Sequence, residues 1–118
     1  MPLQHLALRV ADIERARRFY AQELGFDAAE PVWHADVLFL RNADGFSLAL
    51  MPAQQAPRPS GVDHFGFRLP TPEAVRQLRQ RFAASGIPIL EDVEEPDLVS
   101  FKCADPDGYR VEVSWEPS

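Results

Sequence analysis

Two stretches of this chain repeat the same local pattern around a histidine. The segment His5-Leu6-Ala7-Leu8-Arg9-Val10 is echoed by His64-Phe65-Gly66-Phe67-Arg68-Leu69. A second echo follows in each half, because Asn42-Ala43-Asp44-Gly45-Phe46-Ser47-Leu48-Ala49-Leu50 aligns with Asp105-Pro106-Asp107-Gly108-Tyr109-Arg110-Val111-Glu112-Val113. The two echoes come in the same order in both halves. The chain is therefore predicted to be a duplication of one structural unit.

The length of the chain, 118 residues, fits one domain built from both halves. Each half has about 60 residues, a size at which a domain buries too little apolar surface to be more than marginally stable alone. We expect a single domain over residues 1–118, with repeat one at about 1–52, a linker at about 53–61 and repeat two at about 62–118. The halves are expected to pack together, either within one chain or by exchange between two chains.

The composition excludes several classes of binding partner and of cysteine site. The chain has 12 basic and 18 acidic residues, a net charge of −6 and no basic run, which argues against nucleic acid and anionic membranes as partners. No apolar stretch is long enough to cross a membrane and no signal-peptide core is present, so the expected location is the cytoplasm. Cys103 is the only cysteine, which excludes an internal disulfide and a thiolate zinc cluster and favours a buried, inert thiol.

The first half of the chain shows the pattern of one strand, one helix and three further strands. Apolar and polar residues alternate over residues 3–10, as in a half-buried strand. A helix with apolar positions at helical spacing follows between Asp12, a capping residue, and Gly25, a stop signal. Three strands are expected near residues 26–34, 37–41 and 46–51, and Asp44-Gly45 marks a hairpin turn between the last two.

The second half repeats this order. A strand over residues 62–69 precedes a helix that begins after Thr71, an N-cap followed by proline, and ends at Gly86. Strands are expected near residues 87–93, 98–103 and 109–115, with Asp107-Gly108 in the second hairpin turn. We therefore expect an α+β fold in which two βαβββ repeats form a curved mixed β-sheet groove with the helices on the outside.

Strand parity places three candidate metal ligands on the sheet face that points away from the helices. When the neighbouring leucine, phenylalanine and valine side chains face the helices, His5, His64 and Glu112 point to the opposite face. Two imidazoles and one carboxylate suit divalent Fe, Mn, Zn, Ni or Co and leave open positions for water or substrate. The pattern indicates a catalytic metal site. The alternative interpretation is that the histidines are hydrogen-bonded and the glutamate is solvated.

Four segments of the chain carry a family resemblance: residues 5–12, Phe19-Tyr20 followed by Leu24-Gly25-Phe26, His64-Phe65-Gly66-Phe67 and residues 105–112. Together they resemble the vicinal oxygen chelate superfamily, which includes glyoxalase I, extradiol dioxygenases, fosfomycin-resistance enzymes and bleomycin-resistance proteins. The resemblance implies that His5, His64 and Glu112 are the metal ligands. Ala49 occupies the place at which glyoxalase I usually has a fourth, acidic ligand, so the ligand set departs from that enzyme.

Other residues are candidates for binding the substrate. Ser100 and Lys102 share the face of Glu112 one strand away, where they can anchor an anionic or oxygen-rich ligand. His34 is interpreted as an exposed or hydrogen-bonding residue rather than a ligand, and no catalytic acid or base is assigned. The apolar walls of the groove are expected to contain Trp33, Phe39 and Met51.

Two classes of function fit the sequence. The first is a metal-dependent enzyme of the glyoxalase or dioxygenase type, whether lyase, isomerase, dioxygenase or thiol transferase, acting on a small molecule that chelates the metal through two neighbouring oxygens. The alternative is a metal-free protein that sequesters a ligand and resembles bleomycin-resistance proteins, for which a net charge of −6 is suitable. A homodimer is expected, since a chain with two marginal halves gains from a second copy.

Overall fold

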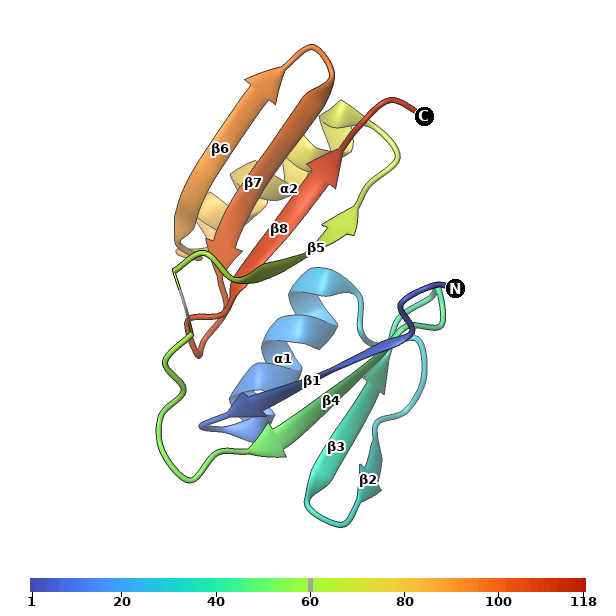
Figure 1. Cartoon of the computed structure of the whole chain (residues 1–118), viewed down its shortest axis with the longest axis vertical. Coiled ribbons are helices and arrows are strands. Elements are labelled where there is room, and N and C mark those ends of the chain that lie inside the picture. The colour runs from blue at the N-terminus through green and yellow to red at the C-terminus, as the bar shows by residue number, and fades with distance from the viewer. Residues whose placement is uncertain (60) are drawn as a thin grey trace. The chain divides into compact units, whose positions relative to one another are not determined.

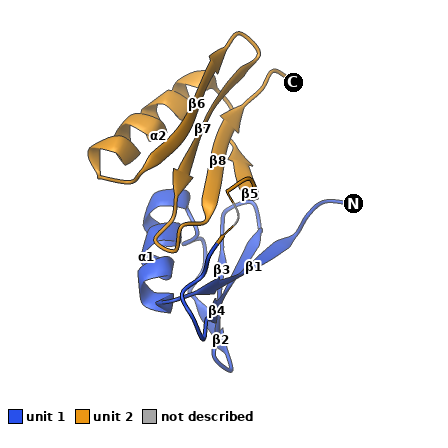
Figure 2. Cartoon of the chain, turned by 60° about the vertical axis from the view of Figure 1, so that its left-hand side comes forward, with its two compact units in different colours: residues 1–58 blue, residues 59–118 orange. Residues whose placement is uncertain are grey.

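Each half of the chain folds into one helix and a four-stranded mixed sheet (Figure 1). The computed structural model describes residues 1–59 and 61–118 and divides them into two units, Met1–Arg58 and Pro59–Ser118 (Figure 2). The boundary between the units falls inside the predicted linker of residues 53–61, of which Ser60 lies outside the described residues. Both units have the predicted βαβββ order, so the expected α+β duplication is confirmed.

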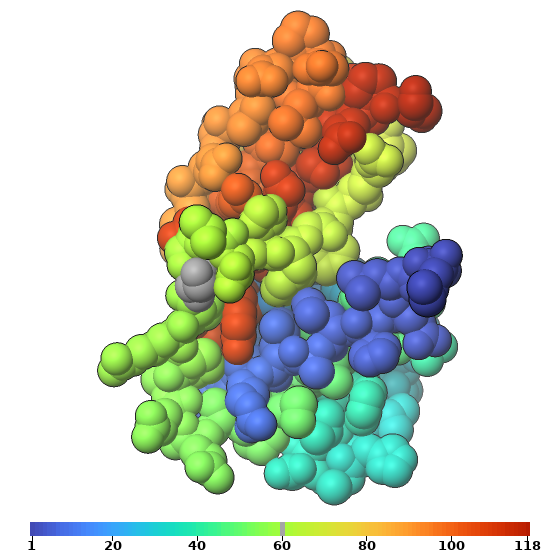
Figure 3. All heavy atoms as spheres, viewed as in Figure 1, coloured from blue at the N-terminus to red at the C-terminus, as the bar shows by residue number. Residues whose placement is uncertain are grey.

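The first unit has the sheet order β1-β4-β3-β2, in which β1 and β4 are parallel and the other neighbours are antiparallel. Asp12 starts the helix by accepting a hydrogen bond from the backbone N–H of Arg15, and Gly25 ends it with a left-handed φ of 76°. In the view of Figure 3 the surface of this unit is coloured dark blue to green, from the N-terminus to the segment that follows β4. The elements are β1 (His5–Val10), α1 (Ile13–Leu24), β2 (Val32–His34), β3 (Val37–Arg41) and β4 (Ser47–Pro52).

The second unit has the corresponding order β5-β8-β7-β6, again with the first two strands parallel. Thr71 caps the helix by accepting a hydrogen bond from the N–H of Ala74, and Phe82 of the helix packs edge-on against Phe101 of the sheet, with ring centroids 5.7 Å apart. Among the residues that the structure describes, no helix has the length and apolar character needed to span a membrane. The elements are β5 (His64–Arg68), α2 (Pro72–Ala84), β6 (Ile89–Glu95), β7 (Leu98–Ala104) and β8 (Arg110–Trp115).

A side-chain oxygen closes the last hairpin of each unit in the same way. The Oδ1 of Asn42 accepts hydrogen bonds from the backbone N–H groups two and four residues later, and the Oδ1 of Asp105 does the same. Gly45 and Gly108 adopt left-handed φ angles of 82° and 87° in these turns, a conformation that glycine reaches without steric cost. The shared turn chemistry explains why both Asp-Gly signals predict hairpins correctly.

The strand registers agree with the alignment of the repeats. The first histidine of each unit begins a strand that runs parallel to the last strand of the same unit. His5 and His64 therefore occupy equivalent places, and Ala49 occupies the place of Glu112. The equivalent register pairs are His5–Ser47 and Ala7–Ala49 in the first unit, and His64–Arg110 and Gly66–Glu112 in the second.

The strand predicted over residues 26–34 is shorter in the structure, where β2 covers only Val32–His34. Phe26 is buried because it packs just beyond the end of α1, not because it belongs to a strand. Its N–H donates a hydrogen bond to the carbonyl oxygen of Tyr20, and the two rings lie edge to face with centroids 6.1 Å apart. An apolar residue at a helix end thus resembled the start of a strand.

Candidate functional site

Two of the predicted ligands lie side by side in the second unit. His64 begins β5 and Glu112 lies in the parallel neighbour β8. The Nε2 of His64 is 3.6 Å from the Oε2 of Glu112, and the two side chains are 35% and 28% exposed. Two donor atoms that each lie about 2.1 Å from one metal ion, at a tetrahedral angle, are about 3.4 Å apart. The separation of this pair therefore fits shared coordination of one ion.

The backbone orients the imidazole of His64 so that Nε2 is left for a ligand. The Nδ1 of His64 is 3.1 Å from the carbonyl oxygen of Val62. Since a carbonyl only accepts, Nδ1 carries the proton, and in the neutral ring Nε2 presents a lone pair to Glu112. The lone pair and the carboxylate repel each other, so the arrangement is stable only when a cation or a proton lies between them. Metal-bound histidines are commonly held by such a hydrogen bond from the other ring nitrogen, so this donor pair fits a divalent metal.

A glycine lets β5 approach β8 closely beside Glu112. Gly66 is the register partner of Glu112 between β5 and β8. A Cβ atom at position 66 would lie 3.0 Å from the backbone oxygen of Glu112 and 3.1 Å from its Cβ, which is closer than ordinary van der Waals contact. Gly66 is not among the predicted site residues. The alignment of the repeats could have indicated it, because a glycine stands there at the place of Ala7, beside the candidate ligand Glu112. Ala7 takes the place of Gly66 in the first unit, where the smaller Ala49 takes the place of Glu112.

Ser100 and Lys102 lie on the face of Glu112, one strand away in β7. Lys102 is the register partner of Glu112 on one side and of Glu91 on the other. Its Nζ is 3.0 Å from the Oε2 of Glu91, so the ammonium group has a carboxylate partner that the sequence did not reveal. Ser100 is buried. The role of both residues in binding a substrate stays a prediction.

The first unit presents the remaining candidates on the face of its sheet that lies opposite the leucine-rich core. His5 is exposed at the start of β1. His34 is exposed as well, which agrees with its interpretation as a residue of the surface, and its ring lies edge-on to that of Phe39 with centroids 6.4 Å apart. The register places on this face His5, His34, Phe39, Ala49 and Met51.

Trp33 lies on the other face of this sheet, so the prediction that it lines the same wall as Phe39 and Met51 is wrong. Trp33 is the register partner of Leu38, whose side chain is buried in the core of the unit. The hairpin turn between β2 and β3 sets this parity, because it pairs His34 with Val37 across Ala35, which has a left-handed φ of 54°. Val32 and His34, the neighbours of Trp33 in β2, therefore lie on the same face as Phe39.

Within residues 1–59 and 61–118, no three His, Cys, Asp or Glu side chains gather into a group that could hold a metal ion. The pair of His64 and Glu112 supplies two of the three predicted ligands, and His5 in the first unit stays a prediction as the third. Cys103 is fully buried, and burial raises its pKa to about 12, with a further contribution from the charge of Asp105. The thiol is therefore protonated near neutral pH and inert, as expected.

Residues 3–113 match the model of the Glyoxalase/Bleomycin resistance protein/Dioxygenase superfamily. The chain belongs to this superfamily. The predicted resemblance to vicinal oxygen chelate proteins is thereby confirmed, and it extends over nearly the whole chain.

Individual relatives agree with this membership. Uncharacterized protein PA2024 of Pseudomonas aeruginosa is 32% identical over 126 residues, which cover 96% of this chain and 87% of the relative. The structure of a possible glyoxalase from Bacillus cereus has a TM-score of 0.79 at 28% identity, covering 96% of this chain and 97% of its own. The fosfomycin resistance protein FosX of Listeria monocytogenes, at 19% identity, shares the fold with a TM-score of 0.78 and coverage of 99% and 94%.

Proposed function

We propose that this member of the superfamily is a divalent-metal-dependent enzyme of the glyoxalase or dioxygenase type that acts on a small oxygen-chelating molecule. The observation that carries the proposal is the pair of His64 and Glu112, in which the imidazole Nε2 is 3.6 Å from a carboxylate oxygen while Nδ1 is 3.1 Å from the carbonyl oxygen of Val62. We propose His5, the repeat equivalent of His64, as the third ligand. The protein is proposed to act as a homodimer.

The charges around Glu112 support a cation at this place. Glu91, Lys102 and Glu112 occupy one row across β6, β7 and β8. Within this row Glu91 pairs with Lys102, so the negative charge of Glu112 is left to attract a cation. Lys102 lies in the strand on the other side of Glu112 from His64, so it leaves the imidazole side of that carboxylate open. Serine and lysine on this face are proposed to orient the oxygens of a substrate.

The chemistry of the proposed enzyme follows from the donor set. A divalent ion of Fe, Mn, Zn, Ni or Co held there would supply Lewis acidity toward a substrate oxygen. The carbonyl of Val62 orients the imidazole of His64 before a ligand binds. A preoriented ligand loses little freedom on binding.

Elemental analysis of protein purified without an affinity tag tests the proposal. The native protein is expected to contain about one divalent metal per site, and His5→Ala, His64→Ala and Glu112→Ala are each expected to lose it while staying folded. His34→Ala is the matched control, because it removes an exposed imidazole from the edge strand β2 and is expected to retain the metal. Unchanged metal content in both His5→Ala and His64→Ala would show that the ligand assignment is wrong.

A metal-free protein that sequesters its ligand is the second candidate function. Apolar side chains left open to solvent on the strands of the first unit favour it, since Val32 is 56% and Phe39 is 39% exposed on the same face. The elemental analysis separates the two functions. Native protein that holds no metal under any loading condition, but binds a small molecule on this face, would establish the second.

A further inference from the structure

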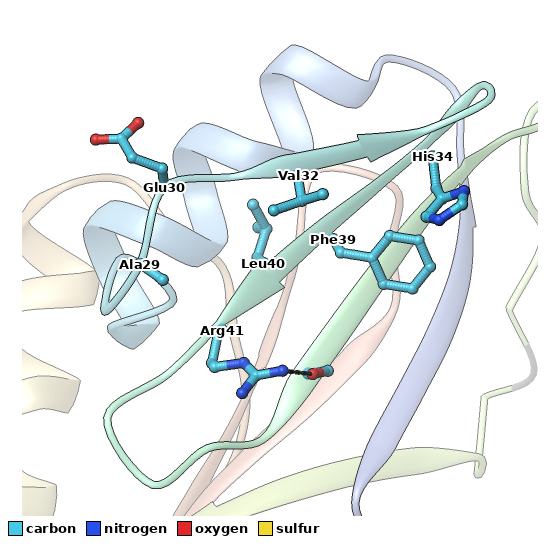
Figure 4. A pocket seen from close by; sticks show the side chains of 8 residues that line it. Ala29, Glu30, Val32, His34, Phe39, Leu40 and Arg41 are labelled. Carbon is cyan, nitrogen blue, oxygen red and sulfur yellow. Dashed lines mark hydrogen bonds between the residues drawn. The ribbon is translucent and has the colours of Figure 1, made fainter.

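The first unit contains a cavity that the metal ligands do not account for. It has a volume of about 410 Å³ and lies over β2, β3 and the start of β4, with Phe39, Arg41 and Ser47 in its lining (Figure 4). Sites for small molecules typically have volumes of roughly 300–1,000 Å³. The cavity is therefore large enough for a small ligand, and all of its lining comes from this unit.

Arg41 brings a positive charge to this cavity. Its guanidinium donates a hydrogen bond to the Oγ of Ser47 over 3.5 Å, the long end of the range (Figure 4). In the described part of the chain, which lacks only residue 60, no carboxylate pairs with Arg41, whereas Arg17 and Arg76 each pair with an acidic side chain. Glu30, the acidic residue in the lining, points away from Arg41 in Figure 4. Most of the five N–H donors of Arg41 are thus left for a ligand.

The strands of the first unit as a whole favour a negatively charged ligand. They contain two histidines and two arginines and no aspartate or glutamate. In the second unit, by contrast, β6 alone has the sequence ILEDVEE, with four acidic residues. In a chain of net charge −6, the strands of the first unit thus carry the positive charges of two arginines and no negative charge, which favours an anion there.

Register connects this cavity to the proposed ligand His5. His5, Ser47 and Arg41 occupy one row across β1, β4 and β3. Neighbouring strands lie about 4.8 Å apart, so the backbone of Arg41 is about 10 Å from that of His5. Phe39 lies on the same face as Arg41, two residues earlier in β3, with its ring partly exposed. A guanidinium, a hydroxyl and a flat apolar ring therefore stand beside the histidine on one surface.

We propose that this surface determines substrate specificity by binding the anionic group of an aromatic or similarly flat substrate. Arg41 pairs with a carboxylate or phosphonate through two parallel N–H donors, Ser47 adds a hydroxyl donor, and Phe39 packs against the apolar body. The role of this surface as a substrate site rests on the proposed function, because it assumes that the oxygens of the same molecule reach a metal at His5. Recognition of the anion by Arg41 needs no metal.

Calorimetric titration of the full-length protein after chelator treatment tests the proposal with three probes. Phenylphosphonate carries both an anion and a ring, methylphosphonate lacks the ring, and benzyl alcohol lacks the charge. The native protein is expected to bind phenylphosphonate most tightly of the three. Arg41→Gln is expected to weaken this binding at least tenfold, because it removes a hydrogen-bonded charge pair. Phe39→Ala is expected to weaken the binding of phenylphosphonate and to leave the affinity for methylphosphonate unchanged.

Arg18→Gln is the matched control, since it removes the same charge from an exposed position on α1. It is expected to bind all three probes as the native protein does. Equal affinity of Arg41→Gln and native protein for phenylphosphonate, or native protein that binds none of the probes at millimolar concentration, would overturn the proposal. Metal content measured on untreated samples distinguishes a failure of this proposal from a failure of the proposed enzymatic function. If Arg41 discriminates between probes and no sample holds metal, only the proposed enzymatic function fails.

Discussion

Replacing Gly66 with alanine is expected to destabilise the second unit and displace Glu112. The added Cβ would lie 3.0 Å from the backbone oxygen of Glu112 and 3.1 Å from its Cβ, so β5 and β8 must separate by a few tenths of an ångström. Overpacking of this kind costs about 1–3 kcal/mol. Gly66 does not have a left-handed φ, so alanine recovers about 0.4–1 kcal/mol by restricting the unfolded chain. The expected net loss is about 1–2 kcal/mol.

Urea denaturation followed by circular dichroism measures this loss as a change in the free energy of unfolding. Gly61→Ala is the control, because a Cβ at position 61 would meet only the side chain of Arg110 at 3.8 Å, an ordinary contact. This control is expected to be as stable as the native protein or slightly more stable. Gly66→Ala is also expected to release metal to a chelator more readily. If Gly66→Ala proves as stable as Gly61→Ala, the close approach of the two strands does not exist and the explanation given for the position of Glu112 is wrong.

Three further outcomes are expected. Ala49→Glu is expected to retain metal more tightly against a chelator, because it adds a carboxylate at the place equivalent to Glu112; unchanged or weaker retention with the fold preserved would contradict this. Cys103 is expected to resist alkylation until the protein unfolds. Because its pKa rises from 9.0 to about 12 on folding, its contribution to stability is complete below about pH 9 and falls as the pH rises toward 12, a loss that Cys103→Ala removes from denaturation curves. Sedimentation equilibrium at micromolar concentration is expected to give a dimer mass, and a monomer mass would exclude the homodimer.

Local signals in the sequence predicted most of the fold. Asp12 and Thr71 cap the helices that they were expected to cap, because capping depends on one side-chain oxygen and the N–H three residues later. The two Asp-Gly turns were recognisable for the same reason. The excess length of the predicted strand at Phe26 has a different origin, since its burial comes from the ring of Tyr20, a tertiary contact that periodicity does not contain.

For the candidate site, the sequence predicted which residues share a sheet face but not how neighbouring strands pair. Parity placed His64 and Glu112 on one face correctly, because it needs only the alternation of residues within each strand. It did not give the face of Trp33, since β2 has only three residues and its parity depends on the turn at Ala35. The pairing of Lys102 with Glu91 depends on the register between strands, including the irregularity between Ile89 and Glu91, which no pattern within one strand reveals.

The close approach of Gly66 to Glu112 makes position 66 more restricted than its counterpart in the first repeat. A Cβ at position 66 would meet the backbone oxygen and the Cβ of residue 112, atoms that alanine at position 112 would also present. In the first repeat, Ala7 and Ala49 are register partners with both Cβ atoms in place. The same pair of parallel strands therefore accommodates alanine in one repeat, whereas in the other its strands must shift. Equivalent positions of the two repeats thus accept different substitutions, which lets the halves of a duplicated chain diverge in chemistry while they keep one fold.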